Sequence, residues 1–244
     1  MRFKDVFSII GPAMIGPSSS HTAGAARIGR FARQLFGSAP EEADITFYGS
    51  FAATYEGHGT DIAIVGGLLD WQTDDPRIPQ SLQIAEEQGI AVSFREGRGA
   101  FSHPNTAKLL LRSPSGGKTR ELAVIGTSIG GGNIEITAID GFSVKLTGIY
   151  PTLVIRHKDW TGVVASVTDV MRRSRTNIAF MSVDRKGRSG DALTVMELDS
   201  PITEALIAEI GQIETVSAVH IVNLQEAASD ENNGGTTTTR EEQR

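Results

Sequence analysis

Hydroxyl and imidazole side chains are concentrated in one short segment near the start of the chain. Residues 18–22 read Ser-Ser-Ser-His-Thr, and apolar side chains then recur at helical spacing as far as Gly37. Gly37 is a natural helix stop, so the polar segment lies at a helix N-terminus. Free backbone N–H groups and the helix dipole favour an anion at that position. The hydroxyl groups add donors, and His21 can donate, accept or move a proton near neutral pH.

An ordinary helix cap explains part of the same pattern. In that interpretation one serine accepts a hydrogen bond from the first helical turn, and the other polar side chains face solvent. The alternative is a binding site for a small anion. The anion would be contacted by His21 and by the hydroxyl groups of Ser18, Ser19, Ser20 and Thr22.

Three further polar clusters follow along the chain. The first contains His58, Thr60 and Asp61, the second His103 and Asn105, and the third Ser128 beside a run of glycines. Three of the five histidines thus lie in loops rich in glycine, serine or asparagine, which favours one shared pocket. Each cluster alone is also compatible with an ordinary loop. A zinc hydrolase using His21, His58 and His103 is a further possibility, although no two of them have the close helical spacing of metal ligands.

The composition is typical of a globular protein with a sizeable core. The chain has 244 residues, of which 39% are hydrophobic and 21% charged, enough for one large or two ordinary domains. A formal net charge of −6 without a basic stripe argues against nucleic-acid binding. The chain has no cysteine, so it supplies no disulfide or thiolate ligand, which suits the cytoplasm. No stretch is apolar for long enough to span a bilayer, and Asp5 and Gly11-Pro12 disfavour a signal peptide.

The pattern of residues 1–149 is typical of an α+β domain. Apolar runs bounded by turn residues predict strands, and apolar residues at helical spacing predict helices. Besides the helix that ends before Gly37, we expect helices at 60–71 and 79–89 and strands at 44–50, 90–96, 107–112, 119–128 and twice within 133–148. Asp140-Gly141 predicts a tight turn between the last two strands, so antiparallel pairing dominates the end of this domain.

Residues 150–225 have a different pattern. Their order of strand, helix, strand, strand, helix, strand predicts a ferredoxin-like βαββαβ unit. Ser200 and Pro201 are typical of the N-cap and first position of its second helix. The tail, residues 226–244, is polar and nearly free of apolar side chains. It cannot bury enough surface to offset chain entropy, so it is predicted to be disordered.

The segment that contains the serine cluster closely resembles a known signature. Residues 10–30 read IGPAMIGPSSSHTAGAARIGR and are similar to the signature of the beta chains of iron–sulfur-dependent bacterial L-serine dehydratases, also called L-serine deaminases. The shorter stretches GHGTD, SHPNT and GTSIGGGN follow in the order and context that this family shows. The resemblance covers nearly all of residues 1–225.

The resemblance implies a fold and a reaction. Residues 1–149 would adopt the allosteric-substrate-binding-like α/β fold shared with some phosphoglycerate dehydrogenases, and residues 150–225 would be an ACT domain, which often binds amino acids at paired interfaces. The family deaminates L-serine to pyruvate and ammonia, a step of amino-acid catabolism that can feed gluconeogenesis. A [4Fe–4S] cluster serves as the Lewis acid.

The resemblance also implies a partner. The cluster cysteines of this family belong to an alpha chain or an alpha domain. A chain without cysteine therefore resembles the separate-subunit form and would be inactive alone. The expected assembly is a cytoplasmic hetero-oligomer with an alpha subunit, in which this chain also self-associates through its ACT domain.

Roles for individual residues follow from the same resemblance. His21 would transfer a proton or orient the substrate, and the identity of the base that removes the α-proton stays open. The carboxylate or hydroxyl of L-serine would be held by Ser18, Ser19, Ser20 and Thr22. The pocket facing the alpha chain would be completed by His103, Asn105 and Ser128. His58 and Asp61 are weaker candidates, for an anion site or for packing.

In the second domain the resemblance to ACT domains indicates an effector site near the turn from the first strand into the first helix. An amino-acid effector would be contacted by His157, Asp159 and Asn177. Alternatively, Gly162 only permits the turn and the domain only dimerises. A rival function for the whole chain is a pure amino-acid-sensing regulatory protein without a catalytic role.

Overall fold

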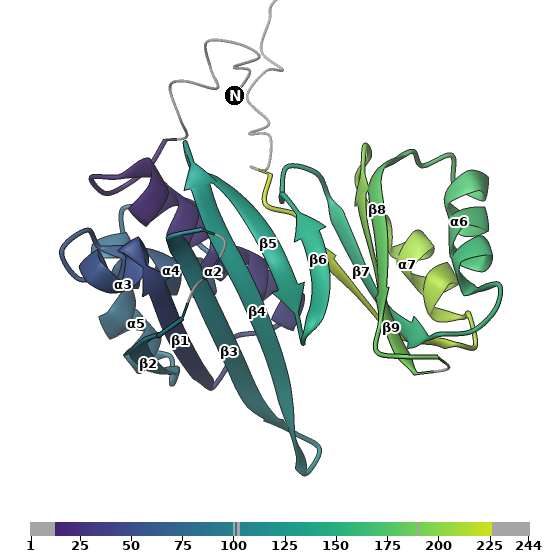
Figure 1. The fold of residues 1–244 in the computed structure, drawn as a ribbon, viewed down its shortest axis with the longest axis horizontal. Coiled ribbons are helices and arrows are strands. Elements are labelled where there is room, and N and C mark those ends of the chain that lie inside the picture. Colours follow the sequence, from purple (N-terminus) through teal and green to yellow (C-terminus); the bar gives the residue numbers. More distant parts are fainter. Residues whose placement is uncertain (1–12, 100, 102, 189, 226–244) are drawn as a thin grey trace, which may run out of the picture.

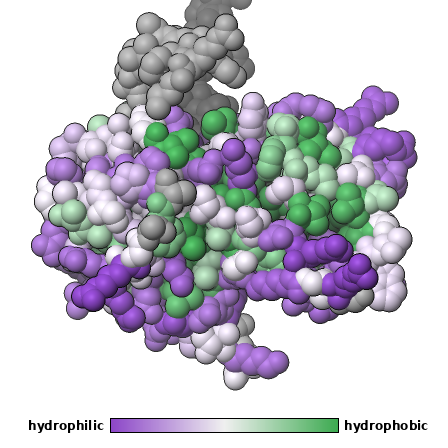
Figure 2. Space-filling model, viewed as in Figure 1, coloured by the Kyte–Doolittle hydropathy of each residue, from purple (hydrophilic) through white to green (hydrophobic). Residues whose placement is uncertain are grey.

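The structure, a computed structural model, describes residues 13–99, 101, 103–188 and 190–225. Two α+β units, each built on its own sheet, lie side by side (Figure 1). Hydrophilic side chains cover much of the face shown in Figure 2, with hydrophobic ones between them toward its centre. The mixed α+β class predicted from the sequence is confirmed. The tail predicted to be disordered, residues 226–244, lies outside the described residues.

The first unit is a six-stranded sheet with helices on one face (Figure 1). Its order is β2-β1-β3-β4-β5-β6; β1 and β2 pair in parallel, and the other neighbours pair antiparallel. The strands are β1 (Glu42–Gly49), β2 (Ala91–Glu96), β3 (Asn105–Ser115), β4 (Lys118–Gly130), β5 (Asn133–Ile139) and β6 (Phe142–Leu146). The helices are α2 (Gly24–Phe36), α3 (Ser50–Thr54), α4 (Thr60–Leu68) and α5 (Ser81–Glu87), with a 3-10 turn, Ile78–Gln80, before α5. The strands and helices predicted for this region are confirmed.

Helices α2 and α4 touch through their backbones. A Cβ atom built on Gly29 would lie 2.1 Å from the carbonyl oxygen of Ile64, and one built on Gly67 would lie 2.0 Å from that of Ala26. Neither position therefore has room for a side chain. This contact fixes the start of α2, which follows the serine cluster, relative to the start of α4, which follows His58.

The turn between β5 and β6 has the geometry that its sequence predicts. Asp140 has a φ of 47° and Gly141 a φ of 78°, the left-handed values of a two-residue hairpin loop. Asp140 Oδ1 also accepts the backbone N–H of Ala123 at 2.6 Å. The predicted hairpin within residues 133–148 is confirmed.

The second unit is a four-stranded antiparallel sheet that packs α6 (Val163–Arg173) and α7 (Glu204–Gly211) on one face. Its strands are β7 (Thr152–Lys158), β8 (Ile178–Arg185), β9 (Asp191–Leu198) and β10 (Val216–Val222), in the spatial order β10-β7-β9-β8. The βαββαβ chain order predicted from the sequence is confirmed, and it is ferredoxin-like. None of the helices in the described part of the chain combines the length and the apolar character that a membrane crossing requires.

The start of α7 differs from the sequence prediction. The sequence places the N-cap at Ser200 and the first helical residue at Pro201, and this is wrong. The N-cap is Thr203, whose Oγ1 accepts the backbone N–H of Leu206 at 3.3 Å. Thr203 is itself a good capping residue, and Glu204 puts a negative charge in the first turn, where the helix dipole favours it. The helix therefore begins three residues later than predicted.

The face of the second sheet that α6 and α7 leave free packs on the first unit. Val154 and Val222 on this face belong to the same buried cluster as the core of the first unit. Glu197, only 4% exposed, accepts hydrogen bonds through Oε1 from the backbone N–H groups of Thr147 at 2.8 Å and Gly148 at 3.1 Å, and from Thr147 Oγ1 at 2.8 Å. This carboxylate ties β9 to the segment that joins the two units.

We expect Glu197→Ala to lower the free energy of unfolding by about 3 kcal/mol, because three donors lose their acceptor and one of them, the N–H of Gly148, is buried. Urea denaturation followed by circular dichroism measures the change. The matched control is Glu209→Ala, since Glu209 forms an exposed pair with Arg173, and such pairs contribute little to stability. Equal losses in the two variants would contradict the structural role given to Glu197.

Candidate active site

The serine cluster is itself helical. Residues Ser19–Ala23 form a turn of π-helix that runs directly into α2, and such turns are frequent at functional sites. Ser18 is the N-cap, because its Oγ accepts the backbone N–H of His21 at 3.2 Å. The capping interpretation is thus confirmed for Ser18. The half-buried Ser19 and Ser20 carry their hydroxyl groups in a first helical turn and not in a loop.

Thr22 lies beneath this turn. It is 1% exposed, and its Oγ1 donates to the backbone carbonyl of His58 at 3.5 Å. Gly16 passes directly over it, since a Cβ atom on Gly16 would lie 2.4 Å from Thr22 Cγ2. The structure therefore places Thr22 where it holds the turn to the loop before α4, and its hydroxyl already has an acceptor.

The imidazole of His21 lies between two serine hydroxyl groups. Its Nε2 is 3.1 Å from Ser50 Oγ, and its Nδ1 is 3.4 Å from Ser18 Oγ. The ring also packs against Phe51, with centroids 5.3 Å apart. Ser50 is not among the site residues that the sequence predicts. The signal that could have found it is the Gly-Ser pair at the end of a predicted strand, where Gly49 adopts a φ of 57°.

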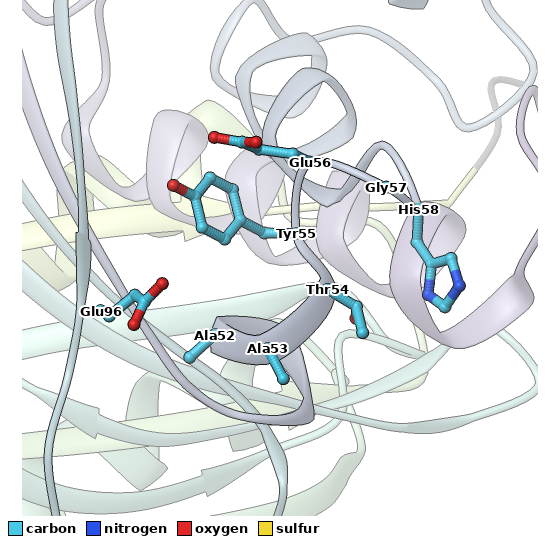
Figure 3. Close-up of a pocket in the computed structure, with 8 residues that line it drawn as sticks. All are labelled: Ala52, Ala53, Thr54, Tyr55, Glu56, Gly57, His58 and Glu96. Carbon is cyan, nitrogen blue, oxygen red and sulfur yellow. The ribbon is translucent and has the colours of Figure 1, made fainter.

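His58 packs against the ring of His21. The two imidazole rings meet edge to face, with centroids 4.9 Å apart and an interplanar angle of 82°. His58 also lines an open hollow of about 410 Å³, which is formed by the second half of α3, the segment between α3 and α4, and Glu96. Figure 3 shows the imidazole of His58 at one end of this hollow and Tyr55 and Glu96 at the other. The structure thus brings together two of the three histidines for which the sequence predicts a shared pocket.

Burial and the neighbouring His58 both lower the pKa of His21 below its ordinary value, because both disfavour the imidazolium form. At neutral pH the ring is therefore mainly neutral, and one nitrogen can accept a proton. Unfolding restores the ordinary pKa of about 6.5, so between the lowered pKa and that value the unfolded chain binds more protons. As the pH falls through this window, His21 destabilises the folded chain.

We expect His58→Gln to raise the pKa of His21, because it removes a group that repels the imidazolium form while the burial of His21 remains. Titration of the imidazole C–H resonances by NMR measures the shift, and the loss of stability in acid due to His21 should shrink with it. His103→Gln is the matched control, since the charge that acts on His21 is that of His58. An unchanged pKa of His21 in His58→Gln would contradict this electrostatic coupling.

The second part of the site lies where β3 begins. Asn105 pairs with Gly49 at the end of β1, so the turn that contains His103 adjoins Ser50, the partner of His21. His103 Nδ1 accepts the backbone N–H of Asn105 at 3.2 Å. The Oδ1 of Asn105 is buried and has no hydrogen-bond partner among the described residues.

Ser128 reaches the site from β4. It is fully buried, and its Oγ has no hydrogen-bond partner within the described part of the chain. It lies against the first residue of α2, because a Cβ atom on Gly24 would be 2.1 Å from Ser128 Oγ. Two more buried polar atoms at the start of α4, Thr60 Oγ1 and Asp61 Oδ1, have no hydrogen-bond partner among the described residues. Burial raises the pKa of Asp61. Buried polar atoms normally have partners, so these groups beside the π-turn indicate a place for a polar ligand.

The three loop histidines do not form a metal site. In the described part of the chain, no group of three or more histidine, aspartate or glutamate side chains is arranged so that it could hold a metal ion. Protein zinc sites use three or four such ligands. The zinc-hydrolase alternative built on His21, His58 and His103 therefore has no donor set.

The three residues predicted to contact an effector are spread over the second unit. His157 is 4% exposed and uses both ring nitrogens, one with a backbone carbonyl and one with Thr194 Oγ1, each at 2.8 Å. Asp159, just after β7, pairs with Arg185 at 3.1 Å. Asn177 comes just before β8, and β7 and β8 run in the same direction because both are antiparallel to β9. Asp159 and Asn177 therefore lie at opposite ends of the sheet, and a single chain does not bring them together.

The fold and the site define a class of α+β chains with two units. The first unit carries a polar site at the start of a helix, and the second is a ferredoxin-like unit. Residues 3–89 match the family described as serine dehydratase beta chain. The probable L-serine dehydratase beta chain of Bacillus subtilis (strain 168) is 48% identical over 219 residues, which cover 90% of this chain and 98% of that protein. The L-serine dehydratase beta chain of Peptoniphilus asaccharolyticus is 35% identical over 225 residues, 92% of this chain and 100% of that one. The chain belongs to the serine dehydratase beta chain family.

Two further proteins show a lower similarity: one is longer than this chain, and the other is a single small domain. The D-3-phosphoglycerate dehydrogenase of Synechocystis sp. is 26% identical over 198 residues, 81% of this chain but 35% of that protein. A match of that length reaches into both units. Among solved structures, the ACT domain from GTP pyrophosphokinase of Chlorobium tepidum is 18% identical with a TM-score of 0.26, covering 30% of this chain and 97% of that one.

Proposed function

We propose that this chain is the beta subunit of an L-serine dehydratase, which converts L-serine into pyruvate and ammonia together with a separate, cysteine-bearing alpha subunit. The observation that carries the proposal is the imidazole of His21, which lies in the first turn of a helix and is held by Ser50. Beside this turn lies the hydroxyl of Ser128, which has no hydrogen-bond partner among the residues that the structure describes. The names of the two dehydratase relatives support the same substrate.

The helix start would hold the carboxylate of the substrate. Its free backbone N–H groups and the hydroxyl groups of Ser19 and Ser20 provide donors, and the helix dipole favours negative charge. Ser128 Oγ and Asn105 Oδ1, which have no partner in the described part of the chain, would bond to the hydroxyl and ammonium groups of L-serine. Holding the carboxylate, the ammonium group and the β-hydroxyl fixes the orientation of the α-carbon and leaves its proton for His21.

We assign the transfer of the α-proton to Nδ1 of His21. Ser50 holds Nε2 at 3.1 Å and fixes the ring, whereas Nδ1 has the longer contact of 3.4 Å with Ser18. The lowered pKa keeps the imidazole neutral, so a lone pair is available. Loss of the α-proton and the β-hydroxide turns L-serine into 2-aminoacrylate, which tautomerises to an imine that water hydrolyses to pyruvate and ammonia.

The chain does not itself fit an iron–sulfur cluster. Such clusters are held by cysteine thiolates, and the chain has no cysteine. Its site offers hydroxyl, amide and imidazole groups instead. In this proposal the [4Fe–4S] cluster and its ligands belong to the alpha subunit, while the residues of this chain bind, orient and deprotonate the substrate.

The second unit we assign to regulation, as an ACT-type domain that pairs with a second copy. The βαββαβ order with strands in the order β10-β7-β9-β8 supports this assignment. The edge strand β8 exposes 45% of Val183, and an edge strand can pair with another chain. Antiparallel pairing of two β8 strands would bring Asn177 of one copy to the end of the sheet that carries Asp159 of the other. An effector could then contact both residues.

Ser128→Ala separates the catalytic proposal from a sensor without a catalytic role. The substitution breaks no hydrogen bond that the structure describes, so stability should stay unchanged or rise. If the chain is a dehydratase subunit, Ser128→Ala should lower the kcat/KM of the assembled enzyme for L-serine by about tenfold or more. If the chain is a pure sensor, Ser128→Ala should leave the turnover of the partner unchanged. Asp159→Asn should then abolish the binding of L-serine. Turnover assays and calorimetry on the two variants distinguish these results.

A further inference from the structure

A second hollow lies between the two units, away from the candidate active site. It has a volume of about 220 Å³ and touches Phe36, the last residue of α2. Helix α2 has 13 residues, so at about 1.5 Å per residue its far end lies about 20 Å from the serine cluster. In Figure 1 the lower ends of β5 and β6 lie beside the second sheet in this region. No residue of this hollow takes part in the proposed reaction.

The floor of the hollow is apolar and comes from both units. The first unit contributes Leu35, Phe36 and Ile139, and the second contributes Val154. Each of these side chains is at most 3% exposed. A ligand that reaches this floor would remove its apolar part from water.

The wall of the hollow carries cationic and titratable groups. Arg156 on β7 and His220 on β10 share one face of the second sheet, because Ala218 pairs with Arg156 and His220 with Val154. Arg120 on β4 approaches from the first unit. Burial and the nearby charges of Arg156 and Arg120 lower the pKa of His220. The two guanidinium groups therefore act on the same small space.

The acidic groups at the hollow leave part of this positive charge uncompensated. Asp140 pairs with Arg156, but a guanidinium has more N–H donors than one carboxylate uses. Glu121 is held by Arg112 at 2.9 Å. Arg120 stacks on the ring of Phe36, 3.9 Å from its centroid, and bonds to a serine hydroxyl. Among the described residues no carboxylate forms an ion pair with Arg120.

We propose that this interdomain hollow binds a small carboxylate with a short apolar body. Guanidinium groups bind carboxylates through paired, charge-assisted hydrogen bonds, and the apolar floor suits an aliphatic chain but not the remaining oxygens of a phosphate. The volume is below the roughly 300–1,000 Å³ of pockets for drug-sized ligands, so the ligand is small. Because both units line the site, the ligand stabilises their observed arrangement.

The test measures binding to the full chain by calorimetry and by thermal unfolding, with 3-methyl-2-oxobutanoate, acetate and inorganic phosphate as probes at equal ionic strength. We expect saturable binding of 3-methyl-2-oxobutanoate and a rise in Tm with its concentration. Acetate, which lacks the apolar body, should bind more weakly. Phosphate should not saturate.

Two variants and a control locate the site. Arg120→Gln should weaken binding by about tenfold or more, because a charge-assisted hydrogen bond is lost. Ala218→Leu should weaken it by filling the space, while circular dichroism reports on the fold of both variants. Arg172→Gln, which changes an exposed arginine on α6, should bind like the unchanged chain.

Three results would overturn the proposal. One is the lack of saturable binding of 3-methyl-2-oxobutanoate up to about 10 mM, the range of weak affinities. Another is binding that neither Arg120→Gln nor Ala218→Leu weakens in a folded chain. The third is phosphate binding as tight as that of the oxo acid, which would make the hollow a bare anion site. None of these results bears on the reaction proposed for His21.

Discussion

Replacing His21 with alanine is expected to lower the kcat of the proposed two-subunit enzyme by roughly 10²- to 10⁴-fold, the range lost when a general acid–base group is removed. His21 is the imidazole that Ser50 and Ser18 hold in the first turn before α2. Its lowered pKa keeps it ready to accept a proton at neutral pH. Its ring is half-buried, so the fold should survive the truncation. Steady-state pyruvate formation, with the unfolding midpoint of the variant, measures both effects.

Chemical rescue separates proton transfer from a structural role. Free imidazole added to His21→Ala can enter the space left by the ring and should restore part of kcat, with a pH dependence set by the added base. His21→Gln, which fills the space without a base, should not be rescued. A His21→Ala enzyme that turns over at the original rate would show that His21 moves no proton.

Gly67→Ala is expected to lower the free energy of unfolding by about 3 kcal/mol, at the upper end of the usual cost of overpacking. The added Cβ would lie 2.0 Å from the carbonyl oxygen of Ala26 and 2.6 Å from the backbone nitrogen of Arg30. Both are backbone atoms of α2, so no side chain can move aside. Helices α2 and α4 must separate, and their starts carry the serine cluster and His58. Urea denaturation measures the loss, and turnover of the assembled enzyme should fall as well.

Gly211→Ala is the matched control for this helix contact. Gly211 is the last residue of α7, and a Cβ atom there would meet nothing within 4 Å. Alanine has the higher helix propensity, so this variant should be as stable as the original chain or slightly more stable. If Gly67→Ala proved equally harmless, the close crossing of α2 and α4 would be wrong.

Much of the fold could be predicted because its signals are local. Asp140-Gly141 specifies a tight hairpin turn, and Gly37 and Gly89 end helices with φ values of 80° and 76°. The start of α7 was predicted wrongly because two local signals compete there. Ser200 and Thr203 are both good caps, and the choice between them depends on which turn buries Leu206 and Ile210 against the second sheet, a tertiary effect.

The candidate site could be predicted only in part, because several of its contacts join distant residues. The cluster at Ser18–Thr22 and His21 within it are visible in the sequence. Ser50 is 29 positions from His21, and nothing in the local pattern shows that the end of β1 meets the start of α2. The sequence predicts that Thr22 contacts substrate or faces solvent, but its side chain is buried beneath Gly16. That the hydroxyl of Ser128 has no partner among the described residues becomes apparent only when burial and hydrogen bonds are known.

The most direct test of the proposed division of labour is pyruvate formation under anaerobic conditions by this chain, by the proposed cysteine-bearing alpha subunit, and by the two together. Because this chain supplies acid–base and binding groups but no cysteine, we expect neither chain alone to turn over L-serine and the mixture to do so. Full pyruvate formation by either chain alone would contradict a reaction centre shared between the two.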